Sequence, residues 1–130
     1  MDQRFHDSAT RFEAGSLSII GLVAAKAAID FLLKIGPDII ERRLMSITDY
    51  LIEKLAGLEI QFHSPLDAQS RSGNVTFKFK NASHVVQRLR KKGYWMSGGF
   101  HYLDGIRVSP HFYNTEEEVD KLVSALKRCM

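Results

Sequence analysis

Apolar residues dominate the stretch from residue 17 to residue 34, where they fill thirteen of eighteen positions. The others recur about every fourth position and form one narrow stripe on a helix: Ser18, Gly21, Lys26, Asp30 and Lys34. Lys26 and Asp30 near its middle would each cost about 2.5–3.5 kcal/mol in a bilayer, so we reject a membrane span. We expect a helix that a further domain or a second subunit buries nearly all round.

A second helix is predicted over residues 38–56, with apolar residues at helical spacing and charged residues on the other side. Gly36 and Pro37 separate the two helices, because glycine suits the end of one helix and proline the first turn of the next. Gly57 is expected to end the second helix. Its inward positions are Ile40, Leu44, Ile47, Leu51 and Leu55.

Beyond Gly57 the apolar period shortens to two, which indicates strands. The clearest case is the alternation of Val75, Phe77 and Phe79 with polar neighbours. Strands are predicted over residues 59–62, 74–79, 94–97 and 105–109, with a loop over 64–73 and a turn at Gly98 and Gly99.

Two shorter helices accompany these strands. One is predicted to begin with Ser83 as its cap and to end at Gly93. The last begins at Thr115, three residues before Glu118, which is the spacing of a capping box. The order of elements predicts an α+β fold with a small, mostly antiparallel or mixed sheet and helices on one face.

Composition narrows the class of protein. The 130 residues are enough for one domain, and 45% apolar with 25% charged residues is typical of a globular chain. The net charge of +3 does not by itself indicate a nucleic-acid partner. The single cysteine, Cys129, leaves no disulfide framework, and the charged N-terminus lacks the apolar run of a signal peptide. We therefore expect a cytoplasmic protein.

Arg107 is the residue whose position points most directly to chemistry. Ile106 and Val108 mark one face of its predicted strand as buried, which places Arg107 and Ser109 on the other face. An arginine there is either simply solvated or available to hold a carboxylate through two parallel hydrogen bonds. Both interpretations remain open at this point.

The remaining candidates favour structural interpretations. The five histidines lack the spacing of a metal site, and nothing near Cys129 in sequence supplies a base, so we assign no metal ligand and no catalytic residue. An RNA-binding module would rest only on the basic run over residues 88–92 and on nearby Tyr94 and Trp95. We therefore expect no nucleic acid and no membrane among the partners.

Two motifs together suggest a family. The first is RFEAGS at residues 11–16, and the second is GIRVSPHFYNTEEEVD at residues 105–120. In this order they resemble the class V aminotransferases, a superfamily of pyridoxal phosphate enzymes that includes cysteine desulfurases, selenocysteine lyases and proteins similar to isopenicillin N epimerase. The resemblance covers nearly the whole chain from about residue 4.

The resemblance implies roles for two residues. In the family the first motif reaches across a dimer interface, and its hydroxyl residue, here Ser16, helps to bind the cofactor phosphate of the neighbouring subunit. The arginine of the second motif, here Arg107, matches the residue that holds the α-carboxylate of an amino-acid substrate. The resemblance thus implies a homo-oligomer and favours the carboxylate-binding interpretation of Arg107.

The sequence departs from the family in two places. Family members attach the cofactor through a lysine that follows a histidine, and no histidine here is followed by lysine. The desulfurases also carry a reactive cysteine before the arginine strand, whereas residues 98–104 contain none. We therefore expect pyridoxal phosphate in the parent enzyme but none bound to this chain alone, and no persulfide chemistry.

The sequence as a whole predicts the C-terminal part of a longer class V aminotransferase-like enzyme that acts on an amino acid. Residues 1–16 are then an interface segment, 17–57 two linking helices and 58–130 the small domain, resembling that of fold-type I pyridoxal phosphate transferases. The alternative is a free-standing α+β module without catalysis, which binds a partner or oligomerises through its apolar first helix.

Overall fold

The computed structural model describes residues 7–13, 15–100 and 103–130, apart from the side chains of Phe100 and Leu103. It divides into two compact units, Met1–Pro37 and Asp38–Met130, and each is described by itself. Several residues that carry predictions lie outside the described ranges: residues 1–6 of the predicted interface segment, which include His6, then Ala14 of the first motif, and His101 and Tyr102 of the stretch 98–104.

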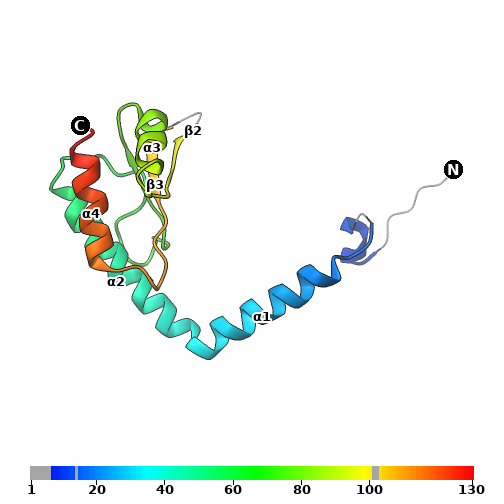
Figure 1. Ribbon diagram of the computed structural model, residues 1–130. Coiled ribbons are helices and arrows are strands. Elements are labelled where there is room, and N and C mark those ends of the chain that lie inside the picture. Colours follow the sequence, from blue (N-terminus) through cyan, green and yellow to red (C-terminus); the bar gives the residue numbers. More distant parts are fainter. Residues whose placement is uncertain (1–6, 14, 101–102) are drawn as a thin grey trace. The chain divides into compact units, whose positions relative to one another are not determined.

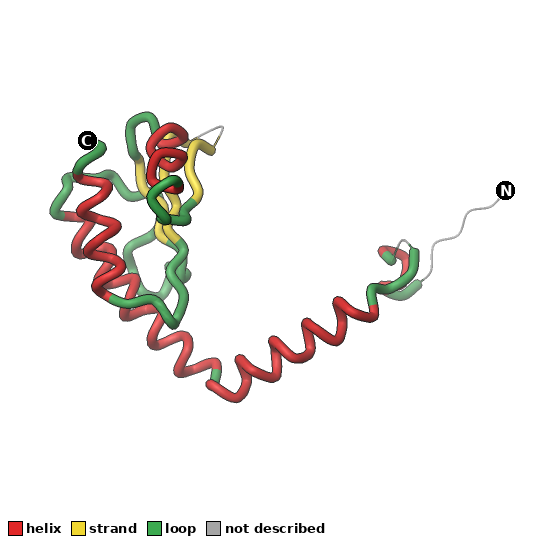
Figure 2. The backbone as a smooth tube through the Cα atoms, in the orientation of Figure 1, coloured by secondary structure: helices red, strands yellow, loops and turns green. Residues whose placement is uncertain are grey.

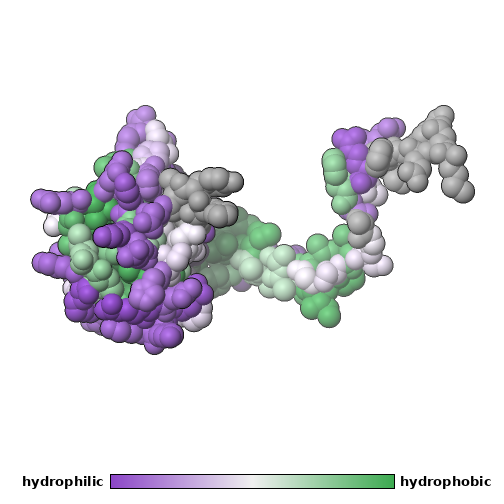
Figure 3. Space-filling model, turned by 90° about the horizontal axis from the view of Figure 1, so that it is seen from above, coloured by the Kyte–Doolittle hydropathy of each residue, from purple (hydrophilic) through white to green (hydrophobic). Residues whose placement is uncertain are grey.

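The first unit contains a short 3-10 helix, η1 (Ala9–Phe12), and the apolar helix α1 (Ile19–Ile35). Ser18 caps α1 by accepting a hydrogen bond from the Gly21 N–H at 3.2 Å. No side chain of α1 is buried, so its apolar residues lie on the surface in Figure 3, where they appear green. The helix forms where the sequence predicts it, and its apolar surface is left uncovered.

The second unit carries the remaining elements (Figures 1 and 2). In chain order they are α2 (Pro37–Ala56), β1 (Val75–Lys78), α3 (Ala82–Arg90), β2 (Ser97–Phe100), β3 (Leu103–Val108) and α4 (Glu116–Lys127). The three strands form one antiparallel sheet in the order β1-β3-β2, so β3 is central. β1 is also flanked on its outer side, where Phe62 forms an isolated bridge with Phe77.

The core lies between one face of this sheet and the three helices of the second unit. The strands contribute Val75, Phe77, Ile106 and Val108, all buried. The helices contribute Ile47, Leu51 and Leu55 from α2, Val85, Val86 and Leu89 from α3, and Val119, Leu122 and Leu126 from α4. The prediction of an α+β fold with a small antiparallel sheet and helices on one face is confirmed.

The first strand of the predicted pair around Gly98 is displaced along the chain. The expected strand over 94–97 is wrong, because the Tyr94 N–H bonds back to the Leu89 carbonyl at 3.1 Å and closes the end of α3. Gly93 adopts a φ of 89° in this closure. β2 starts only at Ser97, and the glycines predicted to form a turn lie within it, next to a break in register between Gly98 and Phe100.

Two further predictions differ in detail. The residues predicted as a strand over 59–62 begin in a turn, where the Glu59 N–H bonds to the Ala56 carbonyl at 3.2 Å. Pairing with β1 starts at Gln61, whose carbonyl accepts from the Lys78 N–H at 2.8 Å, and Phe62 forms the bridge to Phe77. Ser83 does not cap α3. The helix begins at Ala82 instead, and the Ala82 N–H donates to Asp104 Oδ1 at 3.1 Å, so a carboxylate from β3 takes the capping role.

Truncating a side chain on each of the two faces of β1 should have very different effects on the free energy of unfolding. Phe77→Ala removes a fully buried ring and should lower the free energy of unfolding by about 3–5 kcal/mol. Lys78→Ala, one residue along on the exposed face, should change it by less than about 0.5 kcal/mol. Chemical denaturation of the two variants measures both values, and equal costs would contradict the assignment of the two faces.

Candidate functional site

Arg107 lies on the central strand, on the face of the sheet turned away from the helices. Its neighbours Ile106 and Val108 are buried, whereas Arg107 itself is exposed. It pairs with Thr76 of β1 on one side and with Ser97 of β2 on the other. The predicted outward orientation of Arg107 is thus present in the structure, and hydroxyl side chains flank it. We call this side of the sheet the open face.

The segment after β3 turns sharply before α4 begins. Asn114 closes the turn, because its Oδ1 accepts from the His111 N–H at 2.7 Å and its own N–H donates to the His111 carbonyl at 3.0 Å. The His111 ring stacks on Tyr113, with 4.8 Å between ring centroids. These residues of the second motif therefore shape the chain that leaves the arginine strand.

The start of α4 is fixed by the predicted capping box. The Glu118 N–H donates to the Thr115 hydroxyl at 3.3 Å, and the Thr115 N–H donates to the Glu118 carboxylate at 3.0 Å. Asn114 Nδ2 donates to the same carboxylate at 3.0 Å. The hydrogen bond from Asn114, followed by that from the Thr115 backbone, lowers the pKa of Glu118 below its ordinary value.

Arg43 ties this segment to α2. Its two terminal nitrogens donate to the Glu116 carboxylate at 2.6 and 3.2 Å, and Nη2 also donates to the Asn114 carbonyl at 2.7 Å. The hydrogen bond from Arg43 lowers the pKa of Glu116, and the same bond raises the pKa of Arg43. The sequence analysis missed Arg43, since spacing along one helix cannot show a partner 73 positions away.

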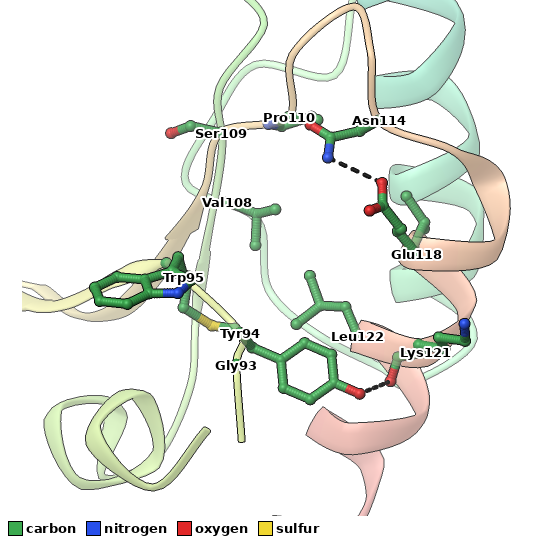
Figure 4. Close-up of a pocket in the computed structure, with 12 residues that line it drawn as sticks. Gly93, Tyr94, Trp95, Val108, Ser109, Pro110, Asn114, Glu118, Lys121 and Leu122 are labelled. Carbon is green, nitrogen blue, oxygen red and sulfur yellow. Dashed lines mark hydrogen bonds between the residues drawn. The ribbon is translucent and has the colours of Figure 1, made fainter. Parts of the chain in front are cut away.

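A hollow of about 320 Å³ opens where Gly93–Met96, the end of β3 and α4 come together. Figure 4 shows Val108 and Leu122 in its depth, with Asn114 and Glu118 at one end and Tyr94 bonded to the Lys121 carbonyl at the other. Trp95 at its edge is 80% exposed and lies against Arg90, so it is not a core residue. Arg107 does not line this hollow.

Ser16 belongs to the first unit and Arg107 to the second. Ser16 is exposed and follows Gly15, which adopts a φ of 92° that side-chain-bearing residues rarely adopt. The two residues that the resemblance singles out are therefore not joined within one compact unit. Their suggested roles remain predictions.

His63 has a position that its sequence does not distinguish from that of an ordinary surface histidine. Its ring lies close to the strand at Gly105, where an added Cβ would come within 3.5 Å of His63 Cδ2. A glycine inside a strand is itself a signal of close approach by another group, and that signal was available in the sequence.

Other candidates keep their structural interpretations. Cys129 is partly buried against the core at the end of α4. Within the described residues, no three histidine, cysteine or acidic side chains are grouped so as to hold a metal ion. In the same part of the chain, no helix is long and apolar enough to span a membrane.

Residues 1–122 match the family model for class V aminotransferases. The chain therefore belongs to the class V aminotransferase family, whose members depend on pyridoxal phosphate.

Curated relatives agree with this family. A probable cysteine desulfurase of Halalkalibacterium halodurans is 31% identical, and that of Staphylococcus aureus strain COL is 29% identical, each over 98% of this chain and 34% of its own length. An uncharacterised protein of Schizosaccharomyces pombe is 29% identical over 98% of this chain and 29% of its own length. The chain thus spans about a third of the length of these relatives.

Solved structures show the same fold. The apo structure of a cysteine desulfurase from Thermococcus onnurineus matches with a TM-score of 0.82 at 25% identity, over 97% of this chain and 34% of that one. A cystine C–S lyase in complex with cysteine persulfide matches with a TM-score of 0.78 at 18% identity, over 97% and 34% of the two chains. The second likeness concerns the fold alone.

The described residues do not by themselves form a site for pyridoxal phosphate. Linking the cofactor to protein takes a lysine amine held in an enclosed site. Of the nine lysines, eight are exposed, and the ninth, Lys54, is half-buried between Tyr50 and Asp120. The hollow beside α4 is lined neither by Ser16 nor by Arg107.

The ion pair between Arg43 and Glu116 predicts a dependence of stability on pH. Because the folded pKa of Glu116 lies below the unfolded value of about 4.3, its contribution is fully present above about pH 5 and is lost as the pH falls through the folded pKa. Glu116→Gln should therefore reduce the fall in Tm between pH 6 and pH 3 by a few degrees. Thermal unfolding at several pH values measures this difference.

The matched control is Glu41→Gln, on the exposed surface of α2. It should leave the pH profile of Tm close to that of the wild type. If the profiles of Glu116→Gln and the wild type coincide, the ion pair contributes nothing to acid stability.

Proposed function

We propose that this chain supplies the substrate-carboxylate side of a pyridoxal phosphate enzyme of the class V aminotransferase family that acts on an amino acid. The observation that carries the proposal is the position of Arg107. The guanidinium stands on the central strand, with both neighbouring side chains buried in the core and hydroxyl residues on either side. The parallel N–H donors of a guanidinium that is held on a central strand are suited to binding a carboxylate.

The proposal divides the chain by role. Residues 1–16 form an interface segment in which Ser16 faces the cofactor phosphate of a neighbouring subunit, residues 17–57 form two linking helices, and residues 58–130 form the small domain. In this proposal the lysine that links the cofactor comes from outside these residues, and the enzyme works as a cytoplasmic dimer. The absence of cysteine from residues 98–104 is the reason we do not extend the desulfurase activity of the relatives to this chain.

In the proposed enzyme Arg107 would act by binding and orienting. Two parallel N–H···O bonds would fix the plane of the substrate carboxylate, and with it the direction of the bonds at the α-carbon. When bound, pyridoxal phosphate supplies an acceptor for the electrons released at that carbon. The anchoring of the segment after β3 by Arg43 and Asn114 would keep the arginine strand from shifting.

The carboxylate role of Arg107 can be tested on the chain itself. L-alanine titrated into ¹⁵N-labelled protein should shift the amide resonances of Arg107 and of its partners Thr76 and Ser97. Arg107→Gln keeps a polar side chain without the charge and should weaken binding about tenfold or more, since charge-assisted bonds are lost. Arg88→Gln, an exposed arginine on α3, is the control and should leave the affinity unchanged. Equal affinities in both variants would overturn the role.

A second function is favoured by one observation, the uncovered apolar surface of α1. None of the side chains of α1 is buried, and Ile20 is 85% exposed. An apolar surface of this kind marks an interaction site. In this alternative the chain is a free-standing module that oligomerises through α1.

Self-association through α1 predicts an average mass that rises with concentration in light scattering. Ile20→Lys combined with Phe31→Lys places charges on this surface and should weaken association at least tenfold. Trp95→Lys removes an equally exposed large side chain from the second unit and should have no effect. A wild-type chain that stays monomeric at every concentration would contradict this alternative.

A further inference from the structure

The open face carries a row of polar residues across adjacent segments of the sheet. Thr76 pairs with Arg107, and Arg107 pairs with Ser97. His63 stands on the other side of Thr76, because its N–H donates to the Thr76 carbonyl at 2.8 Å. Adjacent strands lie about 4.8 Å apart. The row therefore brings an imidazole to the neighbourhood of the arginine proposed to bind the substrate.

The face on which His63 lies follows from its neighbour. Phe62 bridges to Phe77, and the two rings meet edge to face at 6.5 Å between centroids on the core side. Because side chains alternate along an extended segment, His63 projects to the opposite side. This is the side of Arg107.

The ring of His63 crosses β1 and reaches the central strand. A Cβ built on Gly105 would lie 3.5 Å from His63 Cδ2 and 3.7 Å from His63 Nε2. Gly105 and Arg107 are two residues apart on β3 and thus share a face, with roughly 7 Å between their Cα atoms. The missing side chain at position 105 is what gives the imidazole room beside the arginine.

A third side chain on this face carries a positive charge at neutral pH or donates hydrogen bonds, as Arg107 and His63 do: the ammonium group of Lys78. Lys78 pairs with Gly105 in the register of β1 and β3 and is exposed on the same face. The open face thus presents the planar guanidinium of Arg107, and close to it the imidazole of His63 and the ammonium group of Lys78. Such a set suits a ligand with two separate anionic groups better than a ligand with one.

We propose that His63 is a specificity-determining residue, which binds a second carboxylate on a substrate whose α-carboxylate Arg107 holds. The substrate class is then an acidic α-amino acid, with Lys78 adding to the positive potential. This inference rests on the proposed function of Arg107. The competing interpretation is that the ring of His63 only covers the backbone at Gly105, in which case its nitrogens are irrelevant to ligands.

The experiment compares L-glutamate with L-alanine in NMR titrations of the full chain at low salt and neutral pH. Glutamate should bind roughly three to ten times more tightly than alanine, and only glutamate should shift the ring resonances of His63. His63→Phe keeps a ring over Gly105 without its nitrogens and should abolish the preference while leaving alanine binding unchanged. His63→Gln keeps a donor and should retain part of the preference.

His84→Phe is the matched control, because His84 is an exposed histidine on α3 rather than on the open face. It should leave both affinities unchanged. Inorganic phosphate forms a third arm of the titration. Phosphate that binds as tightly as glutamate, with the same shifts, would show a general anion surface and overturn the inference.

The inference and the proposed function fail in different ways. If alanine and glutamate bind equally, and Arg107→Gln abolishes both, the role of His63 is wrong and that of Arg107 stands. If Arg107→Gln leaves both affinities unchanged, the carboxylate role of Arg107 is wrong, and the inference that rests on it is overturned with it. An unchanged preference in His63→Phe also overturns it.

Discussion

The alternation of side chains along β3 is the constraint on which the candidate site depends. Ile106 and Val108 are buried in the core that the sheet forms with three helices. Because side chains alternate along a strand, Arg107 between them must project to the opposite face. Turning the strand over would expose two large apolar side chains and bury a guanidinium, and both changes are unfavourable. The free energy that folds the sheet thereby also fixes the direction of its one outward arginine.

The second motif proves to be mostly architectural. Asn114, Thr115 and Glu118 are used in hydrogen bonds that shape the turn after β3 and cap α4. Arg43 adds the connection to α2. Most of the second motif thus stabilises the chain at the end of β3. Arg107 is the charged side chain of the motif that lies on β3 and faces outward from the sheet.

The parts of the fold that depend on local pattern could be predicted from sequence. The capping box at Thr115 and the two faces of β1 and β3 were predictable, because the residues that decide them are neighbours in the chain. The failures have non-local or competing causes. Tyr94 and Trp95 favour a strand by type, but the Tyr94 N–H is taken by the end of α3.

Candidate-site residues divide in the same way. The outward orientation of Arg107 follows from its immediate neighbours, so the sequence contained it. The approach of His63 to Gly105 and the bond of Arg43 to Glu116 join residues 42 and 73 positions apart, and no local period reports on them. Asp104 took the place expected of Ser83 for the same reason, since a cap can come from a strand that is distant in sequence.

The glycines of β2 set limits on how this scaffold can be altered. A Cβ on Gly98 would come within 2.6 Å of Val86 Cγ2, and one on Gly99 within 1.7 Å of Ser83 Oγ, so α3 lies almost directly on the backbone of that strand. A mutant library aimed at new ligands must leave positions 98 and 99 as glycine. Positions 76 and 78 point away from the helices, and diversity placed there would change recognition without disturbing the layer beneath.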